Sequence, residues 1–529
     1  MANVKTVPAG EASAHLTSAD ATSTHQLIRD KVVEWLRAEG RLTSDRFDDD
    51  ASLFELGVDS LAVATIACEL ERATGKKLNP DIVFDLQTIN EVAEYMDGLP
   101  VRSGPDVLRR VDAPVPTQSF APTTSDIPVA AAPQDHHAYY ARLNRRVQAL
   151  KDEGLYFFEP EISQHDGTWV VADGVRMLML GSYEYLGLLE HPHLQKAAIS
   201  TLEEFGTGHH GARLLTGTTT IHKELEAKLA AFMRAEDAIV FGSGYVTNLA
   251  TISTLVDRDG VIIGDQWNHA SIVDGCRMAG AEMMVFEHND MDSLAEKLEM
   301  ASGRRTLVVV DSVFSMDGDI IDLPMVVRLC RAHGALLMVD EAHSLGVLGK
   351  TGRGAQEYFD LGPDDIDVKM GTLSKSLASG GGFVAAREEI TTYLRHHARG
   401  YIFSGALPVG QASVAIAALE VIEREPERVE RLWQNVEHYS TSLRQLGFDT
   451  ATSVTPIVPV MTKTDDITLA MTRLCREQGL LVVPVCFPAV PMNAPRLRTC
   501  VSALHTKAEL DFALEVLARA GRETGLIPG

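Results

Sequence analysis

The sequence predicts an α/β protein with a mostly parallel sheet and a smaller C-terminal α/β domain, preceded by a small all-α domain. Two observations carry this prediction. From about residue 135 onward, short apolar runs alternate with stretches at helical spacing, as in Ala238–Phe241, Thr306–Val310 and Ala335–Val339. That alternation is typical of strand–helix–strand units, and so of a parallel sheet covered by helices. Before it, residues 22–98 carry apolar residues at the spacing of amphipathic helices.

Length and composition set the domain boundaries around these two patterns. A chain of 529 residues exceeds one ordinary core, and 45% apolar with 23% charged residues is typical of globular domains. We expect a helical domain at 22–98, a linker at 99–134, a large domain with an N-terminal arm at 135–405, and a small domain at 406–529. The linker assignment rests on its seven prolines and on its weak apolar periodicity.

The charge of the chain is strongly acidic and excludes several kinds of partner. The net charge is −25, whereas nucleic acids and anionic membranes attract basic surfaces. Residues 25–98 alone hold sixteen Asp and Glu against eight Lys and Arg. No apolar run approaches the ~20 residues of a membrane span, and Met1–Asp20 lacks the apolar stretch of a secretory signal. We therefore expect a cytoplasmic protein with no nucleic acid partner and no membrane span.

The cysteines stand singly rather than in metal-binding or redox pairs. No C-x-x-C spacing occurs, so we expect reduced, mostly buried thiols and no metal site. The six are Cys68, Cys276, Cys330, Cys475, Cys486 and Cys500.

Polar residues gather where the predicted strands end, which is where parallel sheets bind ligands. Asp311 and Asp340 directly follow two apolar runs, and Lys375 lies in the later run Gly371–Ser376. Pyridoxal phosphate (PLP) requires an imine-forming lysine, an acid for its pyridine nitrogen, an anion site and a wall against its ring. We expect Lys375 to be that lysine and Asp340 to be that acid, because a carboxylate raises the pKa of a nearby pyridinium. His343 is positioned to hydrogen-bond the ring hydroxyl.

A phosphate site is expected at the start of the helix that follows Ala238–Phe241. The backbone amides of Ser243, Gly244 and Tyr245 would face the phosphate there, and glycine allows a close approach. His269 offers an imidazole to stack on the cofactor ring. Each signal taken singly also has an ordinary structural explanation: a strand-end aspartate caps helices, a histidine packs in a core, and glycines form turns.

Taken together, these motifs resemble the α-oxoamine synthase family of fold-type I PLP enzymes, which includes aminooxononanoate synthase and serine palmitoyltransferase. The resemblance runs from about Leu180 to Leu517. The stretches that carry it are Tyr185–Leu188, Gly206–Thr218, His222–Glu226, Val313–Asp319, Asp340–Ser344, Gly371–Lys375, Phe403–Pro408, Arg496–Arg498 and Ala503–Thr506. It implies the fold-type I transferase architecture for the α/β part of the chain, and a homodimer.

The resemblance also implies catalytic roles for four residues. Lys375 would form the imine with PLP and act as the base, and Asp340 would pair with the protonated pyridine nitrogen. His343 would contact the ring hydroxyl, and His269 would stack on the ring.

Further residues would contact the cofactor or the substrate. Ser315 and Thr372 match polar contacts to the cofactor, and Ser404 is a further candidate for the phosphate. Arg498 matches the arginine that binds the substrate carboxylate, a task suited to a planar and permanently charged group. Arg496 is the second candidate for that role, and a surface ion pair is the ordinary alternative for either arginine.

The helical domain contains a candidate modification site. In the run Leu53–Leu61, Ser60 follows a turn and begins a predicted helix through Val63 and Leu70. A plain helix cap is the alternative. The surrounding residues, the length of ~75 residues and the acidity resemble an acyl carrier protein, with Ser60 as the attachment site of 4′-phosphopantetheine. That resemblance implies a phosphopantetheinyl transferase and an acyl-loading enzyme as partners.

Joining the two parts predicts a PLP-dependent acyltransferase that forms a carbon–carbon bond. A small amino acid would condense with an acyl thioester held on the Ser60 arm, with loss of carbon dioxide, to give an α-aminoketone. A flexible linker of ~35 residues reaches roughly 30–35 Å, which allows delivery within the chain or to a partner subunit. Two alternatives stay open: an enzyme that uses free acyl-CoA while its carrier serves another enzyme, and a non-catalytic scaffold that docks carriers.

Three places depart from the family pattern. Glu184 fits neither of the variants found in relatives, which puts substrate contacts there in doubt. His209 and His210 stand where relatives mostly have small residues. Gly405 takes a place that often bears a hydroxyl, so a phosphate contact would fall to Ser404 or be missing.

Overall fold

The computed structural model describes residues 24–38, 88–97, 147–487 and 489–528, together with Ile66, Leu70 and Thr74. Ser60, Cys68 and the linker lie outside the described residues. The chain divides into two units, Met1–Tyr140 and Ala141–Gly529, and each is described by itself. Within the described part of the chain, no helix has the length and apolar character needed to cross a membrane.

The N-terminal unit shows two amphipathic helices, α1 (Thr24–Ala38) and α4 (Ile89–Asp97). They pack against each other through apolar side chains at helical spacing. The buried members of these two helices are Ile28, Val32, Ile89, Val92, Ala93 and Met96, and Ile66 and Leu70 of the same unit are also buried. The predicted helical character of this unit therefore holds for its described residues.

The second unit is built on a seven-stranded sheet with the order β4-β10-β9-β8-β7-β5-β6. Only β10 runs antiparallel to its neighbours, and every other pairing is parallel. This confirms the predicted mostly parallel sheet. The strands are β4 (Asp237–Phe241), β5 (Val261–Asp265), β6 (Glu282–Phe286), β7 (Thr306–Asp311), β8 (Leu336–Asp340), β9 (Val368–Thr372) and β10 (Gly382–Ala386).

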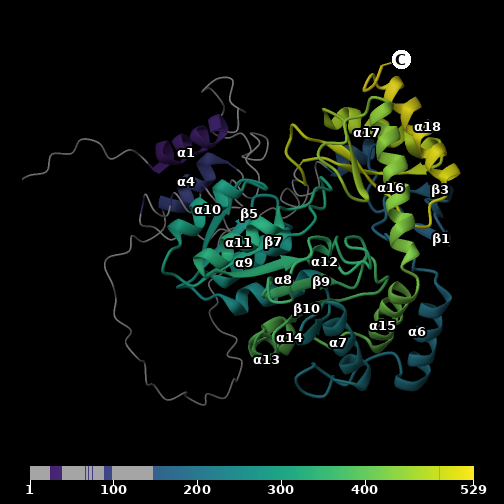
Figure 1. The fold of residues 1–529 in the computed structure, drawn as a ribbon. Helices are drawn as coiled ribbons and strands as arrows, with labels where there is room; N and C mark the ends of the chain where they lie inside the picture. The colour runs from purple at the N-terminus through teal and green to yellow at the C-terminus, as the bar shows by residue number, and fades with distance from the viewer. Residues whose placement is uncertain are drawn as a thin grey trace, which may run out of the picture. The chain divides into compact units, whose positions relative to one another are not determined.

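The two faces of this sheet bury different side chains, because successive residues of a strand point to opposite faces. In β7, Leu307 and Val309 belong to one core and Val308 and Val310 to the other. The first core is covered by α8 (Gly244–Leu255), α9 (Ala270–Ala279), α13 (Glu388–His397) and α14 (Arg399–Ile402). The second is covered by α7 (Thr220–Phe232), α10 (Met291–Met300) and α11 (Leu323–His333). The large domain thus has three layers (Figure 1).

The C-terminal part combines long helices with a small antiparallel sheet of order β11-β14-β13. Its helices are α15 (Val409–Arg424), α16 (Glu427–Gln445), α17 (Asp465–Glu477) and α18 (Lys507–Glu523). Its strands are β11 (Ile457–Met461), β12 (Leu480–Leu481), β13 (Val483–Val485) and β14 (Arg496–Cys500). Two further helices of the unit are α6 (Pro192–Phe205) and the short α12 (Ala355–Tyr358).

The N-terminal arm joins this C-terminal part rather than the large sheet. Its strands β1 (Ile162–Asp166), β2 (Trp169–Ala172) and β3 (Val175–Met179) form a meander, and β3 pairs in parallel with β12. Thr168 Oγ1 and Trp169 Nε1 both donate to Glu509 in α18, beside which the arm lies in Figure 1. The arm thus contacts the C-terminal part of the chain through β12 and α18.

The parallel strands bring four polar residues to one edge of the sheet. Asp265, Asp311, Asp340 and Thr372 are the last residues of β5, β7, β8 and β9. Because these strands run in the same direction, their carboxyl ends meet at the edge where parallel sheets bind ligands.

We predict that Gly382→Ala destabilises the large domain. A Cβ at Gly382 would lie 2.5 Å from Thr247 Oγ1 and 2.7 Å from the Cα of Gly244, so β10 and α8 would have to separate. Overpacking of this kind costs about 1–3 kcal/mol, measured as a lower midpoint of thermal unfolding. Gly208→Ala is the control, because a Cβ there meets nothing within 4 Å. An unchanged midpoint for Gly382→Ala would contradict the close approach of β10 to α8.

Candidate active site

Lys375 lies in the turn between β9 and β10, three residues after Thr372. Its Nζ lies 2.9 Å from Nε2 of His343. The other ring nitrogen of His343, Nδ1, lies 2.7 Å from the hydroxyl of Tyr185. One imidazole therefore joins the lysine to a tyrosine that is 158 residues away from His343 in the sequence.

The surroundings of this group lower the pKa of both the amine and the imidazole. Burial lowers the pKa of Lys375 to about 8, although the negative charges of Asp340 and Asp311 oppose this shift. Burial, helped by the charges of Lys375 and Arg498, lowers the pKa of His343 well below its ordinary value. Near neutral pH the amine of Lys375 is thus far easier to deprotonate than an exposed lysine, which suits it to act as a nucleophile or a base.

Two carboxylates end neighbouring strands, with Asp311 paired in register with Asp340. Asp340 accepts hydrogen bonds from Asn248 Nδ2 at 2.8 Å and from the backbone amide of Ala342 at 2.8 Å. Asp311 accepts the backbone amide of His269 at 2.7 Å. Burial and the adjacent charge of Asp340 raise the pKa of Asp311 well above its ordinary value. Asp311 is therefore suited to hold a proton and to position the backbone of His269.

The start of α8 provides anion-binding groups. Ser243 caps the helix by accepting the amide of Val246, and the amides of the first residues, Gly244 and Tyr245, have no carbonyl partner within a helix. A Cβ at Gly244 would lie 3.0 Å from Thr372 Oγ1, so this helix end closely approaches the end of β9. The predicted strand, turn and helix are confirmed. Helix dipole and free amides together favour a phosphate at this position.

His269 is tied into the same network. It caps α9, and its Nδ1 lies 2.7 Å from the hydroxyl of Ser271. Ser271 in turn accepts a hydrogen bond from Asn248 Nδ2, the group that also donates to Asp340. Burial lowers the pKa of His269. Asn248 is a site residue that the sequence motifs did not predict. Its position one turn after Gly244, on the same face of the helix, could have indicated it.

The two candidate arginines have different surroundings. Arg496, Arg498 and Cys500 are two residues apart along β14, so their side chains lie on the same face of the strand. Arg496 donates to the carboxylate of Asp317 at 2.5 Å and is buried in that ion pair. Arg498 donates through Nε to the carbonyl of Ser315 at 2.8 Å, and its charge lowers the pKa of Lys375. Of the two, Arg498 is the arginine that lies with the lysine.

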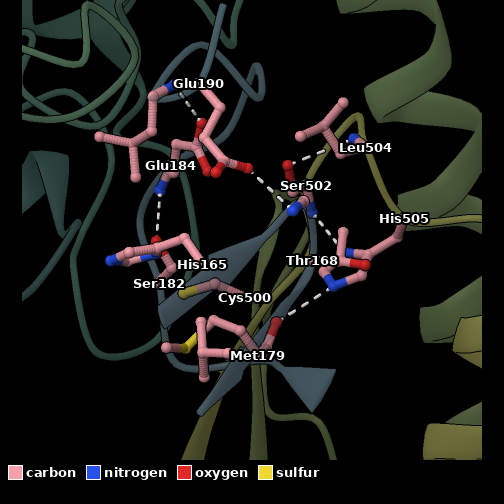
Figure 2. A pocket seen from close by; sticks show the side chains of 13 residues that line it. His165, Thr168, Met179, Ser182, Glu184, Glu190, Cys500, Ser502, Leu504 and His505 are labelled. Atoms are coloured by element: carbon pink, nitrogen blue, oxygen red, sulfur yellow. Dashed lines mark hydrogen bonds between the residues drawn. The ribbon is translucent and has the colours of Figure 1, made fainter. Parts of the chain in front are cut away.

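A pocket lies where the arm meets the segment around Glu184 and the end of β14 (Figure 2). The volume of the pocket, including the open space at its mouth, is about 560 Å³. Its walls come from the arm, from the segment around Glu184 and from the end of β14. Glu184 accepts the backbone amide of Leu189 at 2.7 Å, and burial raises its pKa. Glu184 thus lines this pocket, whereas the next residue, Tyr185, contacts His343.

The remaining departures from the family pattern meet in space. A Cβ at Gly405 would lie 2.7 Å from the ring of His209, and Gly405 forms a strand-like bridge with Ala212. The carbonyl of His210 accepts the hydroxyl of Thr216 within the same loop. Ser404 is half-buried beside this loop, and the hydrogen bonds of Lys375 and His343 described above do not involve it.

Comparison with known proteins matches both parts of the chain. Residues 175–517 match the family model described as aminotransferase class I and II, and residues 26–96 match the phosphopantetheine attachment site model. The 8-amino-7-oxononanoate synthase of Symbiobacterium thermophilum is 42% identical over 73% of this chain and 98% of its own length. A serine palmitoyltransferase of Bacteriovorax stolpii is 40% identical over 72% of this chain and 91% of its own length.

The fold has solved counterparts. A serine palmitoyltransferase structure with PLP as its internal aldimine superposes with a TM-score of 0.72 and 35% identity, over 74% of this chain and 100% of that one. The family match covers more than half of the chain, and the relatives are matched over nearly their whole length. The chain therefore belongs to the α-oxoamine synthase family of fold-type I PLP enzymes, with a phosphopantetheine attachment domain ahead of the enzyme.

Proposed function

We propose that this enzyme condenses a small amino acid with an acyl thioester carried on its own N-terminal domain, releasing carbon dioxide and an α-aminoketone. The observation that carries the proposal is the placement of Arg498 beside Lys375, in a chain that also has a phosphopantetheine attachment domain. An arginine next to an easily deprotonated lysine suits a substrate with both a carboxylate and an acidic α-proton.

The residues around Lys375 fit PLP. The lysine amine has a lowered pKa, Asp340 is a buried carboxylate at a strand end, and the start of α8 meets Thr372 where a phosphate would need donors. His269 supplies an accessible ring close to Asp340 and Lys375, whose charges both act on its pKa. When bound, PLP supplies an electron sink for the electron pair left on the α-carbon of the amino acid.

The side chains of this protein would then bind, orient and move a proton. Arg498 binds the amino acid carboxylate, and the backbone carbonyl of Ser315 keeps its guanidinium in place. Lys375 Nζ takes the α-proton, and His343, locked by Tyr185, orients that amine. A carbon–carbon bond forms to the thioester carbonyl, the pantetheine thiol leaves with a proton, and the carboxylate leaves as carbon dioxide and is replaced by a proton.

The carrier domain supports a tethered acyl donor rather than a free one. Residues 26–96 match the phosphopantetheine attachment model, and Ser60 lies within that range. Tethering of two modules on a short linker supplies effective concentrations near the millimolar range, which favours a donor held on the same chain. A phosphopantetheinyl transferase and an acyl-loading enzyme would be needed to prepare this donor.

The proposal also includes a homodimer. Leu215 and Phe403 are large apolar side chains that are 78% and 74% exposed, and both belong to the segments around the His209 loop and the Ser404 turn. Covering such side chains with a second copy would remove apolar surface from water.

The direct test uses intact-protein mass spectrometry. Holoprotein whose Ser60 arm carries an acyl group is mixed with glycine, serine or alanine, and the mass of the acyl group should disappear from the protein with at least one of them. The proposal would be contradicted if none of the three amino acids made the acyl group disappear faster than it does without any amino acid.

A Ser60→Ala variant separates the tethered donor from free acyl-CoA. This variant keeps the whole enzyme domain, so a CoA-using enzyme would turn over acyl-CoA at the wild-type rate. We expect the Ser60→Ala variant with free acyl-CoA to turn over at least tenfold more slowly than wild-type protein with an acyl group on its arm. The reason is that the variant loses the millimolar effective concentration of the tethered donor.

The two arginines provide a matched pair of variants. Arg498→Lys should raise KM for the amino acid by about 10- to 100-fold, because a bidentate charged contact worth about 1.5–3 kcal/mol is lost. Arg496→Lys should lower the midpoint of thermal unfolding and raise KM much less than Arg498→Lys does, since Arg496 pairs with buried Asp317. Steady-state kinetics and thermal unfolding of both variants check this, and equal KM effects would contradict the assignment.

The lowered pKa of Lys375 predicts how cofactor attachment depends on pH. Only the neutral amine attacks the PLP aldehyde, so the attachment rate for apoprotein should rise with pH and level off above about 8 rather than above 10.5. Mass spectrometry after borohydride reduction measures the rate, and Lys375→Ala is the control without attachment. A rate that keeps rising through pH 10 would contradict the desolvated amine.

A further inference from the structure

The turn Ser315–Asp319 is held by three basic side chains from different parts of the chain. Arg498 binds the carbonyl of its first residue, and Arg496 binds the carbonyl and the carboxylate of the next two. His288, which follows β6, lies 2.9 Å from the carboxylate of the last residue, Asp319. The acceptor that orients Arg498 is therefore part of a turn whose other end depends on His288.

His288 lies between two buried carboxylates. Its Nδ1 is 2.9 Å from Asp265 and its Nε2 is 2.9 Å from Asp319. A carboxylate accepts hydrogen bonds, so both ring nitrogens carry a proton in this arrangement. Trp267 stacks on the ring with centroids 3.7 Å apart, and Phe314 meets it edge to face at 4.4 Å. The site is thus built for an imidazolium, with two anions in the plane of the ring and an aromatic face above it.

The effect of this site on the pKa of His288 is large. Burial lowers the pKa, but the hydrogen bonds and charges of Asp265 and Asp319 outweigh burial and raise it to about 9. These two carboxylates, one at the end of β5 and one in the turn after β7, are the titratable groups that act on the ring. The imidazolium is therefore present at neutral pH and is lost as the pH rises through about 9.

Asp265 connects the imidazolium to the turn that presents His269. Its Oδ1 also accepts the amide of Trp267, and its Oδ2 accepts the amide of Asn289. The backbone amide of Asn268 bonds to the Asp265 carbonyl, so the segment from Asp265 to His269 is one hydrogen-bonded turn. Through His288, this turn is fixed against the turn that orients Arg498.

We propose that His288 is a positioning residue that acts as a charged brace between the His269 turn and the Ser315–Asp319 turn, and so sets the distance from Arg498 to Lys375. The second oxygen of Asp319 has no partner and is buried, so His288 supplies the only hydrogen bond that the described residues give this carboxylate. The consequence for substrate binding rests on the proposed function, whereas the brace itself does not.

A spectroscopic titration tests the brace without any substrate. A protonated imidazole quenches a stacked indole, so the emission of Trp267 should rise as the pH passes about 9. Emission is recorded from pH 6 to 10.5 for the wild-type holoprotein and for Trp267→Phe, and the difference isolates one of the four tryptophans. His288→Asn should abolish the transition. A transition near 6.5 in the wild type, or none above pH 7.5, would overturn the proposal.

Kinetics test what the brace does for the site. At pH 7.5, His288→Asn should raise KM for the amino acid about tenfold and change kcat much less, because the Arg498 acceptor is displaced while the chemistry at Lys375 is kept. His438→Asn is the matched control, since His438 pairs with Asp511 near the surface, and it should leave both constants unchanged.

The outcomes separate this inference from the proposed function. An unchanged KM in a folded His288→Asn variant overturns the positioning role. If the variant does not fold, Asp319→Asn, which removes the charge from one end of the brace, should lower the pH of the emission transition, and an unshifted transition overturns the proposal. If no amino acid is a substrate, the proposed function fails while the titration still decides whether the brace exists.

Discussion

The active site depends on the burial of an amine and two carboxylates at one edge of a parallel sheet. Asp311 and Asp340 lie side by side in register at the ends of β7 and β8, and Lys375 follows the next strand. Burial disfavours charge on each of them, and the pKa values of Lys375 and Asp311 move in opposite directions as a result. The side-chain amide of Asn248 and the backbone amide of His269 compensate by donating hydrogen bonds to Asp340 and Asp311.

The order of strands explains why this arrangement was largely predictable. Strands β5, β7 and β8 are short, apolar runs followed or ended by aspartate, and a parallel sheet places such ends together. Lys375, Asp340 and His343 were predicted from their local motifs, and the structure brings them into one group. The helix start at Gly244 followed from a strand and two glycines.

Contacts between distant segments could not be predicted in the same way. Tyr185 was recognised only as part of a motif, because nothing near it in sequence indicates that it meets His343. The pairing of the arm with β12 could not be predicted, because β12 has two residues, too few to produce a periodic pattern. Arg496 and Arg498 have the same strand periodicity, and only the buried Asp317 beside Arg496 separates their roles.

The same limits apply to the residues that depart from the family pattern. The ring of His209 occupies the space that a side chain at position 405 would need, so the two substitutions depend on each other sterically. Glu184 lines the pocket that the arm and the end of β14 enclose. Neither relation is visible from residue identity, because each is set by packing between segments that are far apart in the sequence.

The proposed reaction couples carbon–carbon bond formation at the carrier thioester to loss of the amino acid carboxylate. The most direct measurement follows a single turnover of acyl-loaded holoprotein with an amino acid labelled at its carboxyl carbon. We expect one labelled carbon dioxide for each acyl group lost from the protein, and an α-aminoketone without label. Transfer of the acyl group with the label retained in the product would contradict it, because the enzyme would then acylate its substrate without decarboxylation.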